Sequence, residues 1–258
     1  MANSLENILH YRVIGDGHPV VFLHGFMLSS TLWKNLSVNI PKGIQGIFID
    51  LPGHGASNTI ECPDNIDDIA SLVHETIKSV TVKPFSIVGH SMGGYIALEL
   101  LKKRVPIKKC VLLNSNFWED SAEKKKERNR IAKVVKLNAQ YLIQEAIPHL
   151  FPPSTKNNFE AEIKDYIDVA LQMNPQNILN ATIAMRDRPD LSSVMRKNPS
   201  KFFIIQGVLD HIIPNELMEY YLKKYHLENV LLYQNNSGHM SIIEKEQEVE
   251  KIVFDFLT

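Results

Sequence analysis

The chain has 258 residues and is 44% hydrophobic, which provides enough apolar material for one large buried core. Lysine and arginine number 28 against 29 aspartate and glutamate, so the formal net charge is −1. This balance excludes an overall field that would attract nucleic acid or an anionic membrane. We therefore expect one main domain and a small-molecule ligand, with neither nucleic acid nor a membrane as partner.

The N-terminal segment and the cysteines favour a cytoplasmic protein. Residues 1–12 lack the basic start and apolar stretch of a secretory signal, and no run approaches the roughly 18 apolar residues that span a bilayer. Cys62 and Cys110 are expected to end a strand or to sit in a loop. Two cysteines in a chain of this length do not suggest a disulfide scaffold, so we expect both thiols to be free.

Strand and helix patterns alternate through the first 115 residues. Four short apolar runs read as buried strands, namely Pro19–Leu23, Ile44–Asp50, Phe85–Gly89 and Lys109–Asn114. Helical periodicity follows over Ile66–Val80 and again over Tyr95–Lys103. The alternation predicts an α/β fold, with a mostly parallel sheet flanked by helices on both faces.

Helical patterns alone fill the segment from Phe117 to Asn198, which we call the insertion. Its first helix opens at Asp120 or Ser121, and its expected apolar face consists of Ile131, Val134, Val135, Tyr141 and Leu142. A second helix is expected over about 159–173. A third begins with Asn174 as N-cap and Pro175 as first helical residue.

Strand and helix alternation resumes after the insertion. The expected elements are a strand at Phe202–Gln206, a helix from Pro214, a strand at Val230–Tyr233 and an amphipathic terminal helix. The sequence therefore predicts a core domain of residues 1–116 and 199–258, interrupted by a helical cap at 117–198.

The segment Gly89-His90-Ser91-Met92-Gly93 places G-x-S-x-G between a predicted strand and a predicted helix, which is the context that the motif requires. A serine at so sharp a turn needs small residues two positions before and after it, and the two glycines meet that need. The motif would occur by chance in roughly one chain in ten. We predict that Ser91 is a nucleophile, and the alternative is a glycine-rich turn that only permits tight packing.

A serine nucleophile needs a base and an orienting acid. Among the ten histidines, His239 has the right position, in a glycine-flanked loop between the last strand and the last helix. The acid is expected before it in the chain, and Asp210 follows the Phe202 strand. The alternative acid position after the preceding strand holds only Asn and Ser, from Asn114 to Asn116. A helix cap beside Pro214 is the alternative role of Asp210.

Acyl transfer also requires donors for the oxyanion that forms at the carbonyl. The backbone N–H of Met92 follows the nucleophile, and the N–H of Phe26 follows the first strand. Gly25 would let the chain turn inward there, although an ordinary strand-ending glycine is the plainer explanation.

These motifs together resemble the α/β-hydrolase superfamily. The matching segments are His24-Gly25-Phe26, Asp50–Ser57, Gly89–Gly94, Gly207-x-x-Asp210 and Ser237-Gly238-His239. The resemblance is to the serine carboxylesterase and haloperoxidase-like branch, with a helical cap between the sixth and seventh strands. A serine at position 91 argues against the branches with a carboxylate nucleophile, the haloalkane dehalogenases and epoxide hydrolases. The resemblance also implies that Asp50–Ser57 is a structural loop near the site.

The expected activity is hydrolysis of a small ester or thioester through an acyl-enzyme, without a metal or organic cofactor. Lactones and C–C bonds remain alternative substrates, because one scaffold serves several reactions. A ligand sensor that retains the triad and a carrier-protein-dependent methyl ester esterase are rival functions.

The insertion offers candidates for substrate contact. Trp118, Phe151 and Met185 of the insertion are expected to line an apolar acyl pocket, unless they form the insertion's own core. Met27, outside the insertion, is expected to line the same pocket. Such a pocket would favour short to medium acyl chains over charged or very long ones. Seven basic residues between Lys124 and Lys136 could steer an acidic acyl carrier protein, but a solvated helix face explains them better.

Overall fold

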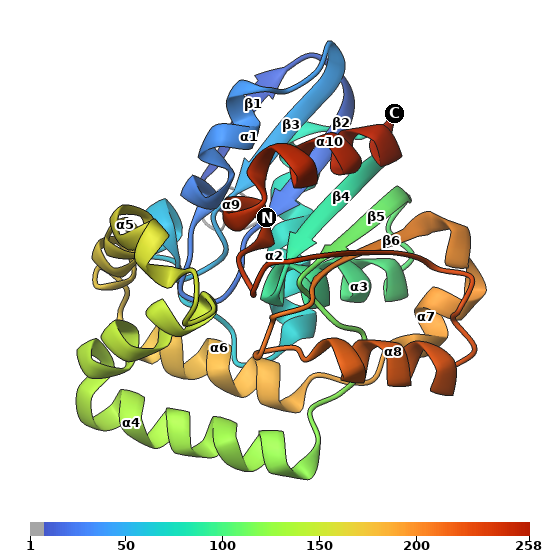
Figure 1. The fold of residues 1–258 in the computed structure, drawn as a ribbon. Helices are drawn as coiled ribbons and strands as arrows, with labels where there is room; N and C mark the ends of the chain where they lie inside the picture. Colours follow the sequence, from blue (N-terminus) through green and yellow to red (C-terminus); the bar gives the residue numbers. More distant parts are fainter. Residues whose placement is uncertain (1–7) are drawn as a thin grey trace.

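In the computed structural model, which describes residues 8–258, seven strands form one sheet in the order β1-β3-β2-β4-β5-β6-β7 (Figure 1). The strands are β1 (Tyr11–Gly15), β2 (Gly17–Leu23), β3 (Gly43–Ile49), β4 (Phe85–His90), β5 (Ile107–Leu113), β6 (Phe202–Gly207) and β7 (Leu231–Asn235). Only β1 is antiparallel to its neighbour. The mostly parallel sheet is confirmed. Residues 1–7, part of the segment expected to carry no targeting signal, lie outside the described residues.

Helices cover both faces of this sheet, as the alternation predicts (Figure 1). The helices are α1 (Lys34–Val38), α2 (Ile66–Val80), α3 (Met92–Lys102), α4 (Ala122–Ala146), α5 (Glu160–Ala170), α6 (Pro175–Asp187), α7 (Ser192–Lys197), α8 (Asn215–Lys224), α9 (Ser241–Glu244) and α10 (Glu246–Leu257). Within residues 8–258, no helix is long and apolar enough to cross a membrane.

Two hydrophobic cores form because successive side chains of a strand point to opposite faces. In β2, Val21 and Leu23 pack into the core beneath α2, α3 and α8. Val20 and Phe22 pack into the core shared with α1 and α10, where the ring of Phe22 stacks on Phe48 with 4.7 Å between centroids. Burial on both faces explains why these strands are continuous apolar runs in the sequence.

Local signals place several elements accurately. Helix α2 has the predicted bounds, and Asn65 caps it by accepting a hydrogen bond from the N–H of Asp68 at 2.8 Å. Helix α6 begins as predicted, with Asn174 as cap and Pro175 in the first turn. Strand β1 was not predicted. It is a short edge strand with no fully buried residue, so its sequence lacks the apolar run that marks the other strands.

The insertion lies between β5 and β6 in the numbering of the described strands. The expected position between the sixth and seventh strands counts strands as the resembled branch does and stays a prediction. The insertion's helices α4 and α6 run side by side (Figure 1). At its base, the Phe117 carbonyl accepts from the N–H of Leu191 at 2.8 Å, and Asp120 pairs with Arg188 at 2.6 Å. The division into core and cap domains stays a prediction.

Helix α4 differs from its predicted pattern near its end. It begins as expected after Ser121, whose hydroxyl accepts from the N–H of Lys124 at 3.2 Å. At Asn138 the backbone leaves the helical conformation, with φ −160° and ψ 89°, and this break rotates the last turns. Tyr141 is therefore 55% exposed, and its expected place on the apolar face is wrong.

The two cysteines are free and buried. Cys62 lies in a loop, as expected, whereas Cys110 lies within β5 rather than at its end. Burial raises the pKa of the Cys62 thiol to about 12, so both its position and its protonation make it unreactive.

Candidate active site

Ser91 sits at a sharp turn between β4 and α3, with φ 50° and ψ −116°. Such a positive φ is strained for any residue with a side chain. A Cβ on Gly89 would lie 2.5 Å from the carbonyl of Gly93, and one on Gly93 would overlap the carbonyl of Leu23. The G-x-S-x-G glycines are therefore required because strand, turn and helix come into backbone contact here.

Backbone hydrogen bonds hold this strained turn in place. The N–H of Ser91 donates to the carbonyl of Leu113 at 3.0 Å, at the end of β5. The carbonyl of Ser91 accepts from the hydroxyl of Ser115 at 2.6 Å and from the N–H of Gly94 at 2.9 Å. The turn is thus fixed from the neighbouring strand as well as from its own helix.

Ser91, His239 and Asp210 form a connected row of side chains. The Nε2 of His239 lies 2.9 Å from the Oγ of Ser91, and its Nδ1 lies 2.8 Å from the Oδ2 of Asp210. A carboxylate can only accept, so the hydrogen bond assigns the ring proton to Nδ1 and leaves Nε2 free to receive a proton from the serine. The sequence-predicted residues meet in the arrangement that general-base activation of a serine requires. Their catalytic roles stay a prediction.

Asp210 is buried, and its oxygens are fully occupied. Oδ1 accepts from the N–H groups of Ile212 at 2.9 Å and Ile213 at 3.0 Å. Burial opposes ionisation of this carboxyl, but the charge of His239 and these hydrogen bonds outweigh it and hold the pKa below its ordinary value. Asp210 therefore stays a carboxylate, which can orient the histidine and stabilise its protonated form.

Asn114 is a site residue that the sequence did not identify. Its Nδ2 donates to the Oδ2 of Asp210 at 3.1 Å and to the carbonyl of Gly238 at 3.0 Å, while its Oδ1 accepts from the hydroxyl of Ser241. It has φ 43°, a conformation that asparagine adopts more readily than most residues. An Asn directly after β5, at the alternative position for the acid, was the available signal.

His90 supports the loop of His239. It is buried, and burial lowers its pKa to about 3, so the ring is neutral. Its Nε2 lies 2.9 Å from the carbonyl of His239 and donates to it. Within residues 8–258 its Nδ1 has no hydrogen-bond partner. The middle residue of the serine motif thereby fixes the backbone of the base without adding a charge beside it.

The expected oxyanion donors lie next to the serine. Met92 is the first residue of α3, so its N–H has no partner within the helix. A Cβ on Gly25 would stand 3.2 Å from the Cβ of Ser91, so the loop that carries Phe26 passes directly beside the nucleophile. Binding of an oxyanion by Phe26 and Met92 stays a prediction.

The loop Asp50–Ser57 has a structural role, as the resemblance implies. The Oδ1 of Asp50 accepts from the N–H of Ser30 at 2.6 Å, and its Oδ2 accepts from the N–H of Ala56 at 3.1 Å. The ring of His24 accepts from the N–H of Leu51 at 2.9 Å. These bonds tie the loop to the backbone that follows β2.

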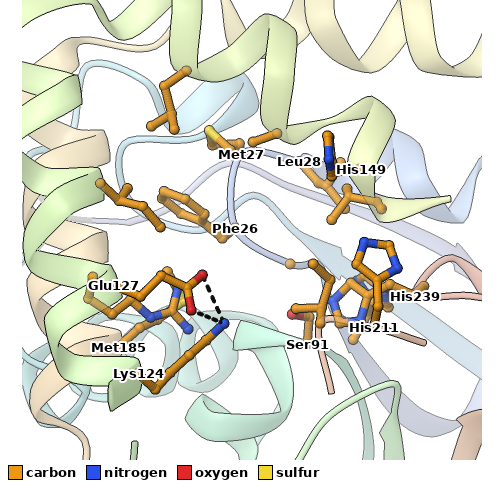
Figure 2. Close-up of a pocket in the computed structure, with 18 of the residues that line it drawn as sticks. Phe26, Met27, Leu28, Ser91, Lys124, Glu127, His149, Met185, His211 and His239 are labelled. Atoms are coloured by element: carbon orange, nitrogen blue, oxygen red, sulfur yellow. Dashed lines mark hydrogen bonds and ion pairs between the residues drawn. The ribbon is translucent and has the colours of Figure 1, made fainter. Parts of the chain in front are cut away.

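A cavity of about 370 Å³ opens at Ser91 and His239 beneath α4 (Figure 2). Met27 and Met185 line it, as expected. Trp118 does not line it, because its ring stacks on Tyr221 at 4.3 Å beside a neighbouring cavity. Phe151 does not line it either, because it is buried against Phe159 at 5.3 Å. Among residues 8–258, no group of three or more His, Cys, Asp or Glu side chains could hold a metal ion.

Comparison with known proteins identifies relatives along nearly the whole chain. The model of the alpha/beta hydrolase fold family matches residues 18–246. A thermophilic esterase from Thermogutta terrifontis, solved with malate bound, is 25% identical with a TM-score of 0.84, covering 96% of this chain and 92% of its own. The enol-lactonase of Burkholderia xenovorans LB400 is 19% identical with a TM-score of 0.83, covering 96% of both chains. The AB hydrolase superfamily protein YisY of Bacillus subtilis is 22% identical over 254 residues, covering 94% of this chain and 92% of its own.

Proposed function

The chain belongs to the α/β-hydrolase family, and from that premise we propose that it is a serine hydrolase that cleaves small esters or thioesters. The observation that carries the proposal is the pair of contacts at His239, 2.9 Å to Ser91 and 2.8 Å to Asp210. The similarity to a thermophilic esterase over 96% of the chain supports the choice of an ester bond.

The first half of the reaction forms an acyl-enzyme. The Oγ of Ser91 attacks the carbonyl carbon while the Nε2 of His239 takes the hydroxyl proton. The N–H groups of Phe26 and Met92 donate to the oxyanion of the tetrahedral intermediate. When that intermediate collapses, the bond from the acyl carbon to the ester oxygen, or to the thioester sulfur, breaks. His239 gives its proton to that atom, and the alcohol or thiol leaves.

The second half releases the acid. His239, neutral again, takes a proton from water, and the resulting hydroxide attacks the acyl carbonyl of the Ser91 ester. Collapse returns the proton from His239 to the serine oxygen. Asp210 stays ionised in both halves, because its low pKa lets it stabilise the protonated histidine without taking the proton.

A lactone is the second candidate substrate. Its ring opening uses the same attack and the same oxyanion donors, and the leaving alcohol stays tethered to the acyl group. The overall similarity to an enol-lactonase favours testing it beside linear esters. A cytoplasmic location belongs to the same proposal and can be tested by cell fractionation.

A fluorophosphonate probe and an ester screen test the proposed function. The probe should label wild-type protein at Ser91, and Ser91→Ala should lose both labelling and turnover of p-nitrophenyl esters. Ser193→Ala, at an exposed serine outside the cavity, is the matched control and should behave as wild type. Labelling at another residue would reject the nucleophile. Labelling at Ser91 without turnover of any ester, thioester or lactone would favour a ligand sensor instead.

A further inference from the structure

Three largely buried charged side chains, Asp120, Arg128 and Arg188, form ion pairs with one another, and we call them the arginine network. All three line a cavity beside that of Ser91 and His239, and Arg128 lines both cavities. The Oδ1 of Asp120 accepts from the Nη1 of Arg188 at 2.6 Å, and its Oδ2 accepts from the Nε of Arg128 at 3.1 Å. The side chains of Asp120 and Arg188 are each 4% exposed, and that of Arg128 is 12% exposed. Two guanidinium groups thus share one carboxylate, which leaves one positive charge without a partner.

Arg188 is held within the protein on several sides. Its Nη1 also donates to the carbonyl of Met185 at 2.7 Å, and its Nη2 donates to the Oδ1 of Asn116 at 3.3 Å. Its guanidinium lies 4.2 Å from the ring centroid of Tyr95. These contacts make Arg188 a fixed support for Asp120.

Arg128 is held only at one end. Its Nε is bonded to Asp120, but within residues 8–258 its two terminal nitrogens have no hydrogen-bond acceptor. They are also not among the polar atoms closed off from solvent, so they remain accessible where Arg128 lines the cavity of Ser91 and His239. Asp120 thus orients a guanidinium whose two free NH₂ groups present the fork that matches a carboxylate.

Within residues 8–258, Arg128 forms an ion pair with no carboxylate other than that of Asp120. Lys124 and Glu127 also line the cavity of Ser91 and His239, but they pair with each other at 3.0 Å, across from those two residues (Figure 2). A second cavity of about 630 Å³ shares Arg128 and Tyr95 with the first and brings the remaining arginine, Arg188, to its wall. A largely buried cation with unfilled donors gains most from an anion that enters the cavity.

Most of the remaining cavity wall is apolar, apart from Tyr95, His149 and His211. Its side chains include Phe26, Leu28, Ile131, Leu142 and Leu150. Helix α4 therefore contributes a charged end through its first turns and an apolar end through its later turns. We propose that Arg128 binds a carboxylate of the substrate, so that the preferred substrates are esters with a carboxylate group on one side of the scissile bond.

This proposal rests on the proposed serine hydrolase and adds a substrate class to it. It reverses the sequence-based expectation that the pocket disfavours charged acyl groups. A carboxylate fits better than a phosphate monoester, because one uncompensated positive charge balances one negative charge, whereas a phosphate dianion would leave an excess. The ester can carry its carboxylate in the acyl part or in the alcohol part.

Matched substrate pairs test the proposal. Monomethyl glutarate against dimethyl glutarate places the charge in the acyl part, and acetoxyacetate against methyl acetoxyacetate places it in the alcohol part. The readout is the ratio of kcat/KM for the charged and neutral member of a pair, which does not depend on how much of the enzyme is folded. We expect a ratio on the order of 10 or more in one pair. Ratios at or below one in both pairs would overturn the proposal.

Arg128→Gln should lower that ratio by on the order of 10-fold or more, because the fork makes two charge-assisted hydrogen bonds. Arg128→Lys keeps the charge but loses the fork, and it should fall between Gln and wild type. Lys133→Gln removes the same charge from an exposed position of α4 outside the cavity and should keep the wild-type ratio. Equal ratios in wild type and Arg128→Gln would restrict the arginine network to a structural role.

Direct binding separates this inference from the proposed function. Titration of Ser91→Ala with glutarate by calorimetry should show binding that Ser91→Ala with Arg128→Gln lacks, and neutral glutaramide should bind neither. Loss of the Ser91 assignment alone would leave this difference in glutarate binding intact. Equal glutarate binding by both variants would overturn the carboxylate site while leaving the hydrolase assignment standing.

Discussion

The sheet edge that carries Ser91 and the insertion that covers it are constrained in different ways. At the edge, Gly89 and Gly93 have no space for a Cβ, and every oxygen of Asp210 is hydrogen-bonded. In the insertion, α4 has 25 residues but buries only Val135 and Ile143. Backbone packing therefore fixes the reacting groups, whereas pairing between side chains shapes the cavity. We therefore expect substitutions in the two regions to differ in the size and kind of their effects.

The largest effect is expected at the acid. Asp210→Asn should lower kcat by on the order of 10⁴-fold, because His239 loses both the charge and the acceptor that set its tautomer. Steady-state kinetics with a p-nitrophenyl ester measure this, with circular dichroism to check folding. Asp255→Asn, at an exposed residue of α10, is the control. Activity near that of wild type in Asp210→Asn would show that substitutions at the sheet edge have no larger effect than substitutions in the insertion.

A smaller effect is expected at Asn114, which positions Asp210. Asn114→Ala should lower kcat by roughly 10- to 100-fold and the free energy of unfolding by about 1–3 kcal/mol, because buried partners lose their hydrogen bonds. Asn114→Gly removes the same bonds but relieves the strain of φ 43°. Both variants should lose similar activity, with the Gly variant more stable in urea denaturation. Unchanged kcat in both would show that the edge tolerates loss of this contact.

The free energy of unfolding should depend on pH because of two buried histidines near the sheet edge, rather than because of groups in the insertion. Burial lowers the pKa of His54 and of His90 to about 3, against 6.5 for an ordinary histidine. Between about pH 3 and 6.5 these two histidines are protonated in the unfolded chain but neutral in the folded chain. The free energy of unfolding is therefore highest above about pH 6.5 and decreases toward pH 3. Each histidine contributes a slope of about 1.4 kcal/mol per pH unit within that window.

His54→Gln should reduce this slope by about one histidine's share, measured as urea midpoints from pH 7.5 down to pH 4.5. His226→Asn, at an exposed position with φ 55°, should leave the slope unchanged. A wild type whose stability is flat over this range would show that the two buried rings take up protons while folded.

The smallest effect is expected on the outer face of α4. Lys125 pairs with Glu119 at 3.0 Å and Lys124 pairs with Glu127 at 3.0 Å, so the helix is less positive than its sequence indicates. Lys126→Glu with Lys133→Glu should change the free energy of unfolding by less than about 0.5 kcal/mol. It should also leave kcat/KM for an acyl-carrier-protein ester unchanged at low and high salt. A salt-sensitive advantage for the carrier ester, lost in this variant, would establish the carrier protein as a partner.

The sequence predicted the edge well because its signals are local. The glycines around Ser91 reflect close backbone packing within a few residues, and the apolar runs before Asp210 and His239 correspond to the strands β6 and β7. The chain order of the three residues then determined which strand ends should meet. Residues that act through distant contacts, such as Asn114, left only a weak trace.

The sequence predicted the insertion less well because its side chains are defined by partners far along the chain. Trp118 has a side chain typical of an apolar pocket, but its ring stacks on Tyr221, about 100 positions further along the chain, and not against the cavity of Ser91. The break at Asn138 is not visible in the apolar pattern of α4. From the sequence, only the positive charge of Arg128 could be recognised. Its proposed role depends on its ion pair with Asp120, which also pairs with Arg188, 68 positions further along the chain.

The contacts at the base of the insertion bear on how this protein could have changed during evolution. The Phe117–Leu191 hydrogen bond and the Asp120–Arg188 ion pair close the chain where it leaves and rejoins the core. With its ends held together, a segment can gain or lose residues at a small entropic cost, since loop closure depends only weakly on length. Changes in the length or sequence of the insertion between this pair are therefore expected to disturb the sheet little.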